Sequence, residues 1–210
     1  MTIQWFGNFF FKVESKEKII AFFPFSEKDC GLKPSRFKAD ILLTNQSEGK
    51  NDYPVFGNPF IVEGPGEVEM GGIFIEGIPD LAENKKEGRK LNTIFFVSSE
   101  NITLCHLGEI KEKKLKEEVL EKVGGVDILL IPIGGNNSIN YEEAIFIANQ
   151  IEPKILIPMN YALPQLRIKL EPVEKFIKAV GGKVETINKL TIKKNNLSAE
   201  ERKVIILNKQ

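Results

Sequence analysis

Three short apolar runs constrain the fold of this chain more than any other feature. They are Ala39–Thr44, Asp127–Ile133 and Lys154–Met159, and aliphatic residues dominate each of them. A run of this length and composition is typical of a β-strand that is buried on both faces. Such strands require a packed layer on each side of their sheet, so we predict a layered protein that contains both strands and helices.

The remaining segments divide into a β-rich first half and a second half in which helices and strands alternate. Gly7-Asn8 is a turn signal between the expected strands Thr2–Phe6 and Phe9–Val13. Thr93–Val97 and Ile102–Leu107 are expected to form a hairpin. Hydrophobic periodicity predicts three helices, Lys111–Val123, Tyr141–Gln150 and Val173–Val180. Two strands, Val184–Ile192 and Lys203–Leu207, are expected to follow them.

Two details refine this pattern. Asn140 precedes an acidic pair, and we predict that it is the N-cap of the middle helix. Pro79–Lys90 is rich in charge, and we predict that it is a mobile loop.

Composition limits the classes of partner. The chain has 210 residues, which suits a single domain over 1–210, and its 29 basic and 29 acidic residues cancel. This balance gives no electrostatic case for binding nucleic acid or an anionic membrane. No apolar run approaches the roughly 20 residues that span a bilayer, and no signal peptide is visible. Two cysteines do not make a disulfide framework, so we expect a cytoplasmic protein.

Several segments, taken in order, resemble the zinc-dependent hydrolases of the metallo-β-lactamase fold, and more closely a widespread cytoplasmic branch of them. That branch opens with W-F/Y-G-H and later has a D-P turn, where this chain has Trp5-Phe6-Gly7-Asn8 and Phe23-Pro24. Further matching segments are Ala39–Thr44, Pro65–Ile73, Asn92–Ile94, Leu104–Glu109, Asp127–Gly135 and Ile157–Tyr161. The resemblance implies an α/β (α+β) protein, a four-layer αββα sandwich in which helices flank two facing mixed β-sheets. It also implies a site at one edge, between the sheets.

The resemblance also identifies the positions where zinc ligands would lie. In the family, the loop after the first buried strand supplies three histidines and one aspartate, and an aspartate and a histidine come from later strands. A further family histidine lies in the loop placed at Pro79–Lys90, which contains none. The other corresponding positions hold Asn45, Ser47, Gly49, Lys50, Glu109 and Asn160.

Only Glu109 among these positions is an acid. Catalytic zinc needs about three protein ligands, so we expect no metal and no other cofactor, and Glu109 would be the ligand if a metal did bind. His106 is the one histidine of the chain, and it matches a family histidine beside the bridging aspartate. The resemblance implies that this histidine supports the metal ligands and does not bind the metal itself. Asn8 and Phe23 replace two further polar residues near the family site.

Other chemistries find little support in the sequence. Cys105 precedes His106, but neighbours in a strand point to opposite faces, so a buried structural cysteine is the better interpretation. Ser47 has no evident base, and Glu109 could be a general base but has no evident partner. Gly134–Asn137 could bind an anion, yet it lacks the lysine and the spacing of a P-loop.

One substitution suggests compensation. We hypothesise that the Lys50 ammonium occupies the vacated cation site and pairs with Glu109, and the alternative is two solvated charges that never meet.

The leading prediction is a hydrolase homologue that has lost its zinc ligands and acts as a non-catalytic binding or scaffold protein, with a small molecule or protein as partner. Rival interpretations are an active metal-dependent hydrolase of the same family that uses Glu109 and non-standard ligands, and an unrelated α/β domain. The sequence predicts no oligomeric state.

Overall fold

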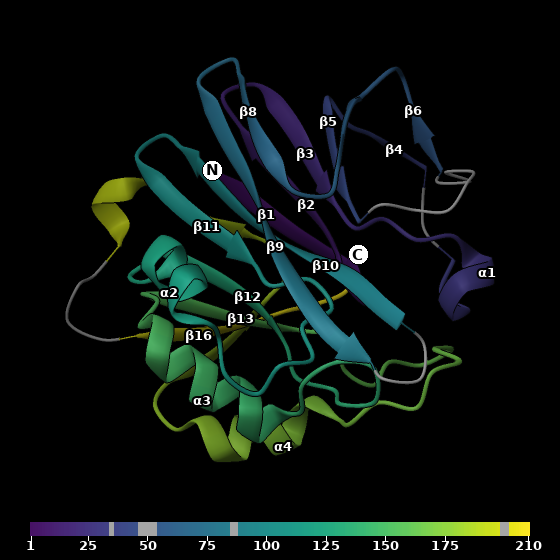
Figure 1. Ribbon diagram of the computed structural model, residues 1–210, viewed down its shortest axis with the longest axis vertical. Coiled ribbons are helices and arrows are strands. Elements are labelled where there is room, and N and C mark those ends of the chain that lie inside the picture. Colours follow the sequence, from purple (N-terminus) through teal and green to yellow (C-terminus); the bar gives the residue numbers. More distant parts are fainter. Residues whose placement is uncertain (34–35, 46–53, 85–87, 198–201) are drawn as a thin grey trace.

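The computed structural model describes residues 1–33, 36–45, 54–84, 88–197 and 202–210. Two large β-sheets face each other within these ranges (Figure 1). The smaller sheet has the strand order β15-β1-β2-β3-β5-β7 and the larger sheet has the order β14-β16-β13-β12-β11-β10-β9-β8. Both sheets contain parallel and antiparallel pairs, which confirms the predicted mixed sheets.

The bounds of the elements follow the chain. The strands of the smaller sheet are β1 (Thr2–Gly7), β2 (Phe10–Ser15), β3 (Lys18–Phe22), β5 (Ile41–Thr44), β7 (Phe60–Glu63) and β15 (Leu190–Thr191). Those of the larger sheet are β8 (Gly66–Met70), β9 (Ile73–Asn84), β10 (Gly88–Ser99), β11 (Ile102–His106), β12 (Ile128–Pro132), β13 (Ile155–Met159), β14 (Val184–Ile187) and β16 (Lys203–Leu207). The remaining elements are β4 (Phe37–Lys38), β6 (Val55–Phe56), α1 (Glu27–Cys30), α2 (Glu117–Val123), α3 (Tyr141–Ile151), α4 (Val173–Val180) and a 3-10 turn at Lys194–Asn196.

Helices lie on the outer faces of both sheets, as the αββα prediction requires. The helices α2, α3 and α4 cover the outer face of the larger sheet (Figure 1). The outer layer of the smaller sheet is thin, because α1 is a single turn. There Cys30, Leu32 and Phe37 pack over Phe10 and Leu42. The four-layer fold class is confirmed.

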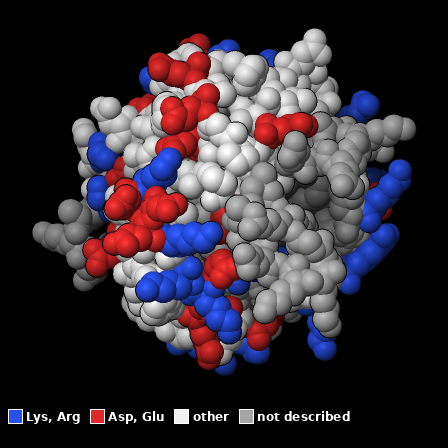
Figure 2. All heavy atoms as spheres, in the orientation of Figure 1, with Lys and Arg blue, Asp and Glu red and all other residues white. Residues whose placement is uncertain are grey.

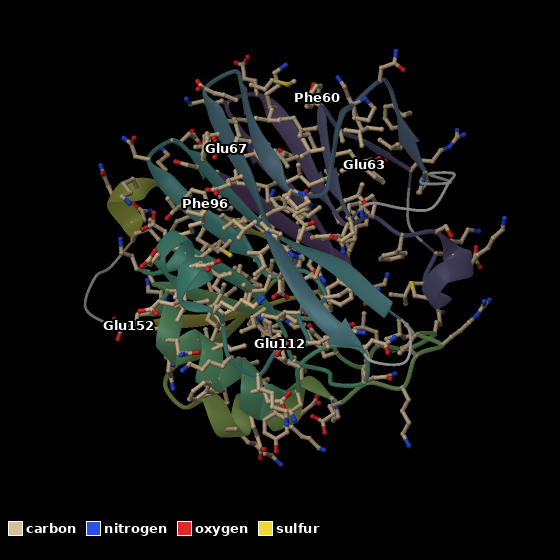
Figure 3. The ribbon with its side chains drawn as sticks, viewed as in Figure 1. Phe60, Glu63, Glu67, Phe96, Glu112 and Glu152 are labelled. Carbon is tan, nitrogen blue, oxygen red and sulfur yellow. The ribbon has the colours of Figure 1, made fainter. Side chains whose placement is uncertain are left out.

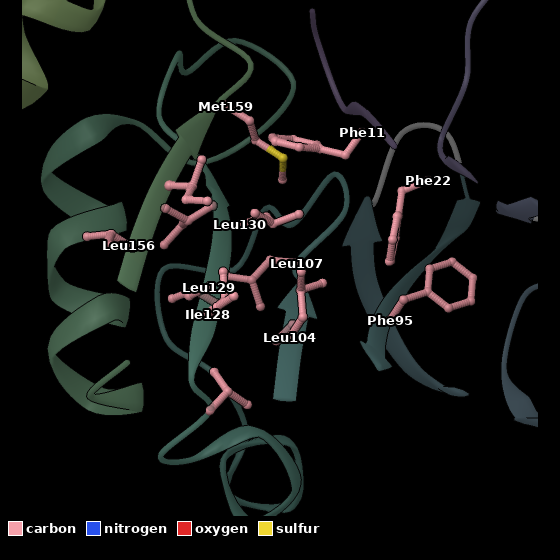
Figure 4. Packing of buried hydrophobic residues seen from close by; sticks show 14 of the residues in the cluster. Phe11, Phe22, Phe95, Leu104, Leu107, Ile128, Leu129, Leu130, Leu156 and Met159 are labelled. Carbon is pink, nitrogen blue, oxygen red and sulfur yellow. The ribbon is translucent and has the colours of Figure 1, made fainter. Parts of the chain in front are cut away.

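The space between the sheets is filled by large apolar side chains. Figure 4 shows Phe11 of the smaller sheet beside Met159 of the larger sheet, and Phe22 beside Phe95. All four side chains are fully buried. Burial of this kind supplies most of the favourable free energy of folding, at roughly 25 cal/mol per Å² of apolar surface.

The three apolar runs form buried strands as predicted. Every residue of β5, β12 and β13 is buried. The cap of α3 is also confirmed, since the Asn140 side chain accepts hydrogen bonds from the backbone N–H groups of Glu142 and Glu143. Gly181 ends α4 with a φ of 67°, a conformation that favours glycine.

The prediction of a mobile loop at Pro79–Lys90 is wrong for the residues described there. Asn84 pairs with Gly88 and Asp80 pairs with Asn92, so β9 and β10 continue as one long antiparallel hairpin. The ladder hydrogen bonds come from the backbone, and the register is already set by the buried half of the hairpin. A run of charged residues therefore did not prevent pairing.

Two other elements differ from their predicted bounds. The expected helix Lys111–Val123 begins only at Glu117, and the predicted strand Val184–Ile192 is two strands in different sheets. β14 joins the larger sheet, and β15 crosses over to pair with β1, where Thr2 lies opposite Thr191. Local hydrophobic periodicity does not reveal a crossover of this kind.

The open edges of the two sheets lie together where the chain passes from β7 to β8. Phe60 and Ile61 of β7 are about half exposed, and acidic Glu63 and Glu67 accompany them (Figure 3). Charge beside an open edge discourages association with other strands.

In the space-filling view, acidic and basic side chains lie next to one another over the helical layer (Figure 2). No helix in the described part of the chain is long and apolar enough to cross a membrane.

Candidate functional site

The predicted site positions lie where several elements end at one edge of the sandwich. Asn45 follows β5, His106 ends β11, and Asn160 follows β13. The turn between β1 and β2 brings Asn8 and Phe9 to the same edge, because backbone and side-chain hydrogen bonds join it to the larger sheet. Ser47, Gly49 and Lys50 lie outside the described residues, so the pairing of Lys50 with Glu109 stays a prediction.

Asn45 is engaged with the opposite sheet. Its Oδ1 accepts a hydrogen bond of 2.9 Å from the backbone N–H of Thr93 on β10. Asn45 is the first of the predicted ligand positions along the chain. The oxygen of its side chain is occupied by a backbone N–H group of the protein.

His106 is a core residue with both ring nitrogens committed. Nε2–H donates to the carbonyl oxygen of Phe9 at 2.9 Å, and Nδ1 accepts from the N–H of Gly108 at 3.0 Å. Since Phe9 offers only an acceptor and Gly108 only a donor, the ring is the neutral Nε2–H tautomer. The ring is fully buried and stacks on Phe22 with an interplanar angle of 7°. Burial lowers the pKa of His106 to about 3, and no ring nitrogen is left for a metal.

Cys105 does not share chemistry with its neighbour. The side chain is fully buried, and burial raises the pKa of the thiol. A thiol that stays protonated is a poor nucleophile and a poor metal ligand. The interpretation as a small buried side chain fits these observations.

The loop that carries Glu109 is held by a buried polar pair that the sequence did not single out. The Glu109 backbone N–H donates to Asn92 Oδ1 at 2.9 Å, and Asn92 Nδ2 donates to the carbonyl of Leu107 at 3.0 Å. Asp80 lies opposite on β9, 3% exposed, with its carboxylate 3.3 Å from Asn92 Nδ2. Burial raises the pKa of Asp80, and the hydrogen bond from Asn92 offsets part of that rise. Asp80 was missed because it falls in the segment predicted to be a loop.

Gly108 fits this loop for a steric reason. Its φ is +62°, and a Cβ atom there would lie 2.3 Å from Asn92 Oδ1. Only glycine combines this backbone conformation with so close an approach. The Glu109 side chain is half-buried in the same loop.

Asn160 is buried and closes the edge on the other side. Its backbone N–H donates to the carbonyl of Asn8 at 3.2 Å, and its Nδ2 donates to Ser138 Oγ at 2.9 Å. The φ of Asn160 is 51°, in the left-handed region that asparagine tolerates better than most residues. Asn8 Oδ1 is buried and has no partner among the residues that the structure describes.

This donor set does not fit a zinc ion. Within the described ranges, no three His, Cys, Asp or Glu side chains are grouped so that they could hold a metal. Asn45 Oδ1 and both nitrogens of His106 already have protein partners. Zinc prefers imidazole, thiolate and carboxylate, and the amides present here are poor substitutes.

A polar pocket adjoins the site on its helical side. It has a volume of about 590 Å³ and reaches from the loop after β12 to the start of α4. Ser138, which contacts Asn160, lines it, and so do Asn136 and Glu171. Glu171 Oε1 accepts from Lys175 at 2.9 Å, whereas the buried Oε2 has no partner in the described structure. The volume lies in the range of small-molecule sites.

Comparison with known proteins gives a consistent picture. Residues 2–160 match the family described as "Beta-lactamase superfamily domain". A UPF0173 metal-dependent hydrolase of Archaeoglobus fulgidus is 25% identical, with 89% of this chain and 95% of the relative covered. A second one, from Pyrococcus horikoshii, is 28% identical, but the match covers only 58% of this chain and 54% of the relative. The crystal structure of a candidate Zn-dependent hydrolase of the metallo-β-lactamase superfamily from Thermotoga maritima superimposes with a TM-score of 0.81, at 28% identity and 98% coverage of both chains.

Proposed function

Because this chain belongs to the metallo-β-lactamase superfamily, we propose that it is a hydrolase homologue without metal-dependent catalysis, and that it serves as a binding or scaffold protein. One observation carries the proposal: at two of the former ligand positions, the side chain hydrogen-bonds to the protein itself. Asn45 Oδ1 accepts from the Thr93 N–H, and Asn160 Nδ2 donates to Ser138 Oγ. His106, which supports the ligands in the family, has both ring nitrogens in contact with Phe9 and Gly108.

The chemistry of the family explains why this matters. Metal-dependent hydrolysis relies on an ion that lowers the pKa of a bound water molecule to near 7. Such an ion needs about three protein ligands in a fixed geometry. Glu109 is the one acid at a predicted ligand position, and a single carboxylate does not meet this requirement.

The pocket beside Asn160 is the surface on which we place small-molecule binding. Glu171 lines this pocket together with Gly135 and Asn136, and its buried Oε2 has no hydrogen-bond donor among the residues that the structure describes. A ligand that carries a primary amine would supply the missing donor through a charge-assisted hydrogen bond. We also propose a cytoplasmic location, in accord with its two cysteines, which are buried thiols.

Metal analysis tests the loss of catalysis. Protein purified without chelators should contain far less than one equivalent of zinc, iron or manganese while remaining folded. Phosphodiester, lactone and thioester substrates should stay intact with and without added Mn²⁺ or Zn²⁺. A near-stoichiometric metal together with turnover would instead establish an active hydrolase that uses Glu109 and ligands outside the described residues.

Ligand screening tests the pocket. Among small primary amines and matched alcohols, the amines should shift the backbone NMR signals of Gly135 and Asn136. Glu171→Gln should weaken amine binding about tenfold, because a hydrogen bond to a charged group is worth about 1.5–3 kcal/mol. Glu174→Gln, an exposed neighbour on α4, is the matched control and should bind amines normally. Equal binding of amines by both variants would remove Glu171 from the site.

A further inference from the structure

We infer that the former metal centre has become a metal-independent hydrogen-bonded seam, which joins the two sheets at this edge of the sandwich. The seam consists of Asn45, His106 and Asn160 with the backbone groups that they contact. The inference rests on the proposed loss of metal binding, and it assigns a new role to Asn45 and Asn160, the two substituted positions in the seam.

The first link runs from the smaller sheet to the larger one. Asn45 follows β5, and its Oδ1 accepts the Thr93 N–H of β10 at 2.9 Å. Thr93 is fully buried, so its N–H has no access to solvent. A buried N–H without an acceptor destabilises the folded state, and Asn45 removes that penalty.

Two further links run from the larger sheet to the turn between β1 and β2. His106 Nε2 donates to the Phe9 carbonyl at 2.9 Å, and the Asn160 N–H donates to the Asn8 carbonyl at 3.2 Å. These are consecutive carbonyls of one turn. The Trp5 indole N–H also donates to Asn8 O at 3.0 Å, which holds the turn against β1.

Packing across the sheets supports the same seam. The imidazole of His106 lies 5.4 Å from the ring of Phe22 at the end of β3, and 4.7 Å from the ring of Phe23. Phe23 stands at one of the positions where the family has a polar residue. An aromatic ring there excludes water, and a hydrogen bond is stronger in such a low-dielectric setting.

A metal ion bound by ligands from several elements ties those elements together, and its removal loosens them. Here each tie is a hydrogen bond between protein groups. The edge is therefore closed without an ion, and its closure should not respond to chelators.

Amide hydrogen exchange of Thr93 is the direct test, measured by NMR on the full chain in EDTA. Asn45→Ala should speed exchange of the Thr93 amide about tenfold, the factor that corresponds to a hydrogen bond worth about 1.4 kcal/mol. Asn45→Asp retains an acceptor oxygen and should keep the amide protected. Asn149→Ala, which removes an exposed asparagine that accepts from Arg202, is the matched control and should leave Thr93 unchanged.

The outcomes separate this inference from the proposed function. Thr93 exchange that is equally slow in wild type and Asn45→Ala, with no metal bound, would overturn the seam alone. Zinc that binds near-stoichiometrically and slows Thr93 exchange in the wild type would overturn both the seam and the proposed loss of metal. Protection of Thr93 that is unchanged by EDTA and lost only in Asn45→Ala supports the seam.

Discussion

The stability of the folded chain should fall by about 1.4 kcal/mol for each pH unit between about 6 and 4. The cause is His106, whose pKa is about 3 in the folded protein and close to the ordinary value of about 6.5 when unfolded. Above the unfolded value both states carry a neutral ring, and the stability is fully present. Below the unfolded pKa, the imidazole binds a proton in the unfolded state but stays neutral in the native state. The free energy of unfolding therefore decreases until the pH reaches the pKa of the folded protein.

Urea unfolding at pH 7, 6 and 5 measures this slope. His106 is the one histidine in the sequence, so no second imidazole contributes. His106→Phe keeps a ring against Phe22 but cannot titrate, and it should be less stable at pH 7 with a much flatter pH dependence. Asp80 has the opposite effect on the pH dependence of stability. Burial raises the pKa of its carboxyl group, so its contribution to the free energy of unfolding is lost as the pH rises. Its effect is common to wild type and variant, so it cancels in the difference. Equal slopes for the two proteins would contradict a buried neutral imidazole.

Asp127→Asn should lower the free energy of unfolding by about 2–3 kcal/mol. The carboxylate is buried and accepts hydrogen bonds from the Thr103 N–H at 2.9 Å, Lys154 Nζ at 2.7 Å and Lys194 Nζ at 2.9 Å. The amide replacement loses the charge and leaves both ammonium groups unpaired. The expected loss is smaller than for a fully buried pair, because both lysines are partly exposed to water.

Urea unfolding at pH 7 checks the size of this effect, with Glu185→Gln on the exposed side of β14 as a control expected within about 0.5 kcal/mol of wild type. Burial would raise the pKa of Asp127, but hydrogen bonds from Lys154, Thr103 and Lys194 outweigh it and hold the pKa below its ordinary value. The contribution of Asp127 is therefore present above about pH 4 and lost as the pH falls through the lowered pKa. A variant as stable as wild type would show that the cluster contributes nothing net.

The parts of the fold that were predictable from sequence are those encoded locally. β5, β12 and β13 are short apolar runs, and the cap at Asn140 is an asparagine before two glutamates. The end of the hairpin at Pro79–Lys90 was not predictable in this way, because its two strands pair in the register set by the buried part of the hairpin, and this pairing overrode a local composition typical of loops. Charge alone separates strand from loop poorly.

The candidate site shows the same division. That asparagine stands at positions 45 and 160, where the resemblance expects histidine, is visible in the sequence, since it needs only the order of motifs. The new partners of these residues are not visible, because Thr93 and Asn8 approach them from another sheet or turn. Asp80 carried no signal at all, and its burial became apparent only from its position opposite Asn92.

The pairing of β15 with β1 has a consequence for how the chain acquires its structure. Thr2 lies opposite Thr191, so β1 cannot complete its outer ladder until a residue 189 positions further along the chain has left the ribosome. Until then that edge of the smaller sheet offers unpaired backbone groups to any other strand nearby. Contacts between residues so far apart in sequence also form slowly. A nascent chain of this protein therefore passes through a long interval in which this edge is exposed to aggregation, and the pairing of β15 ends that interval.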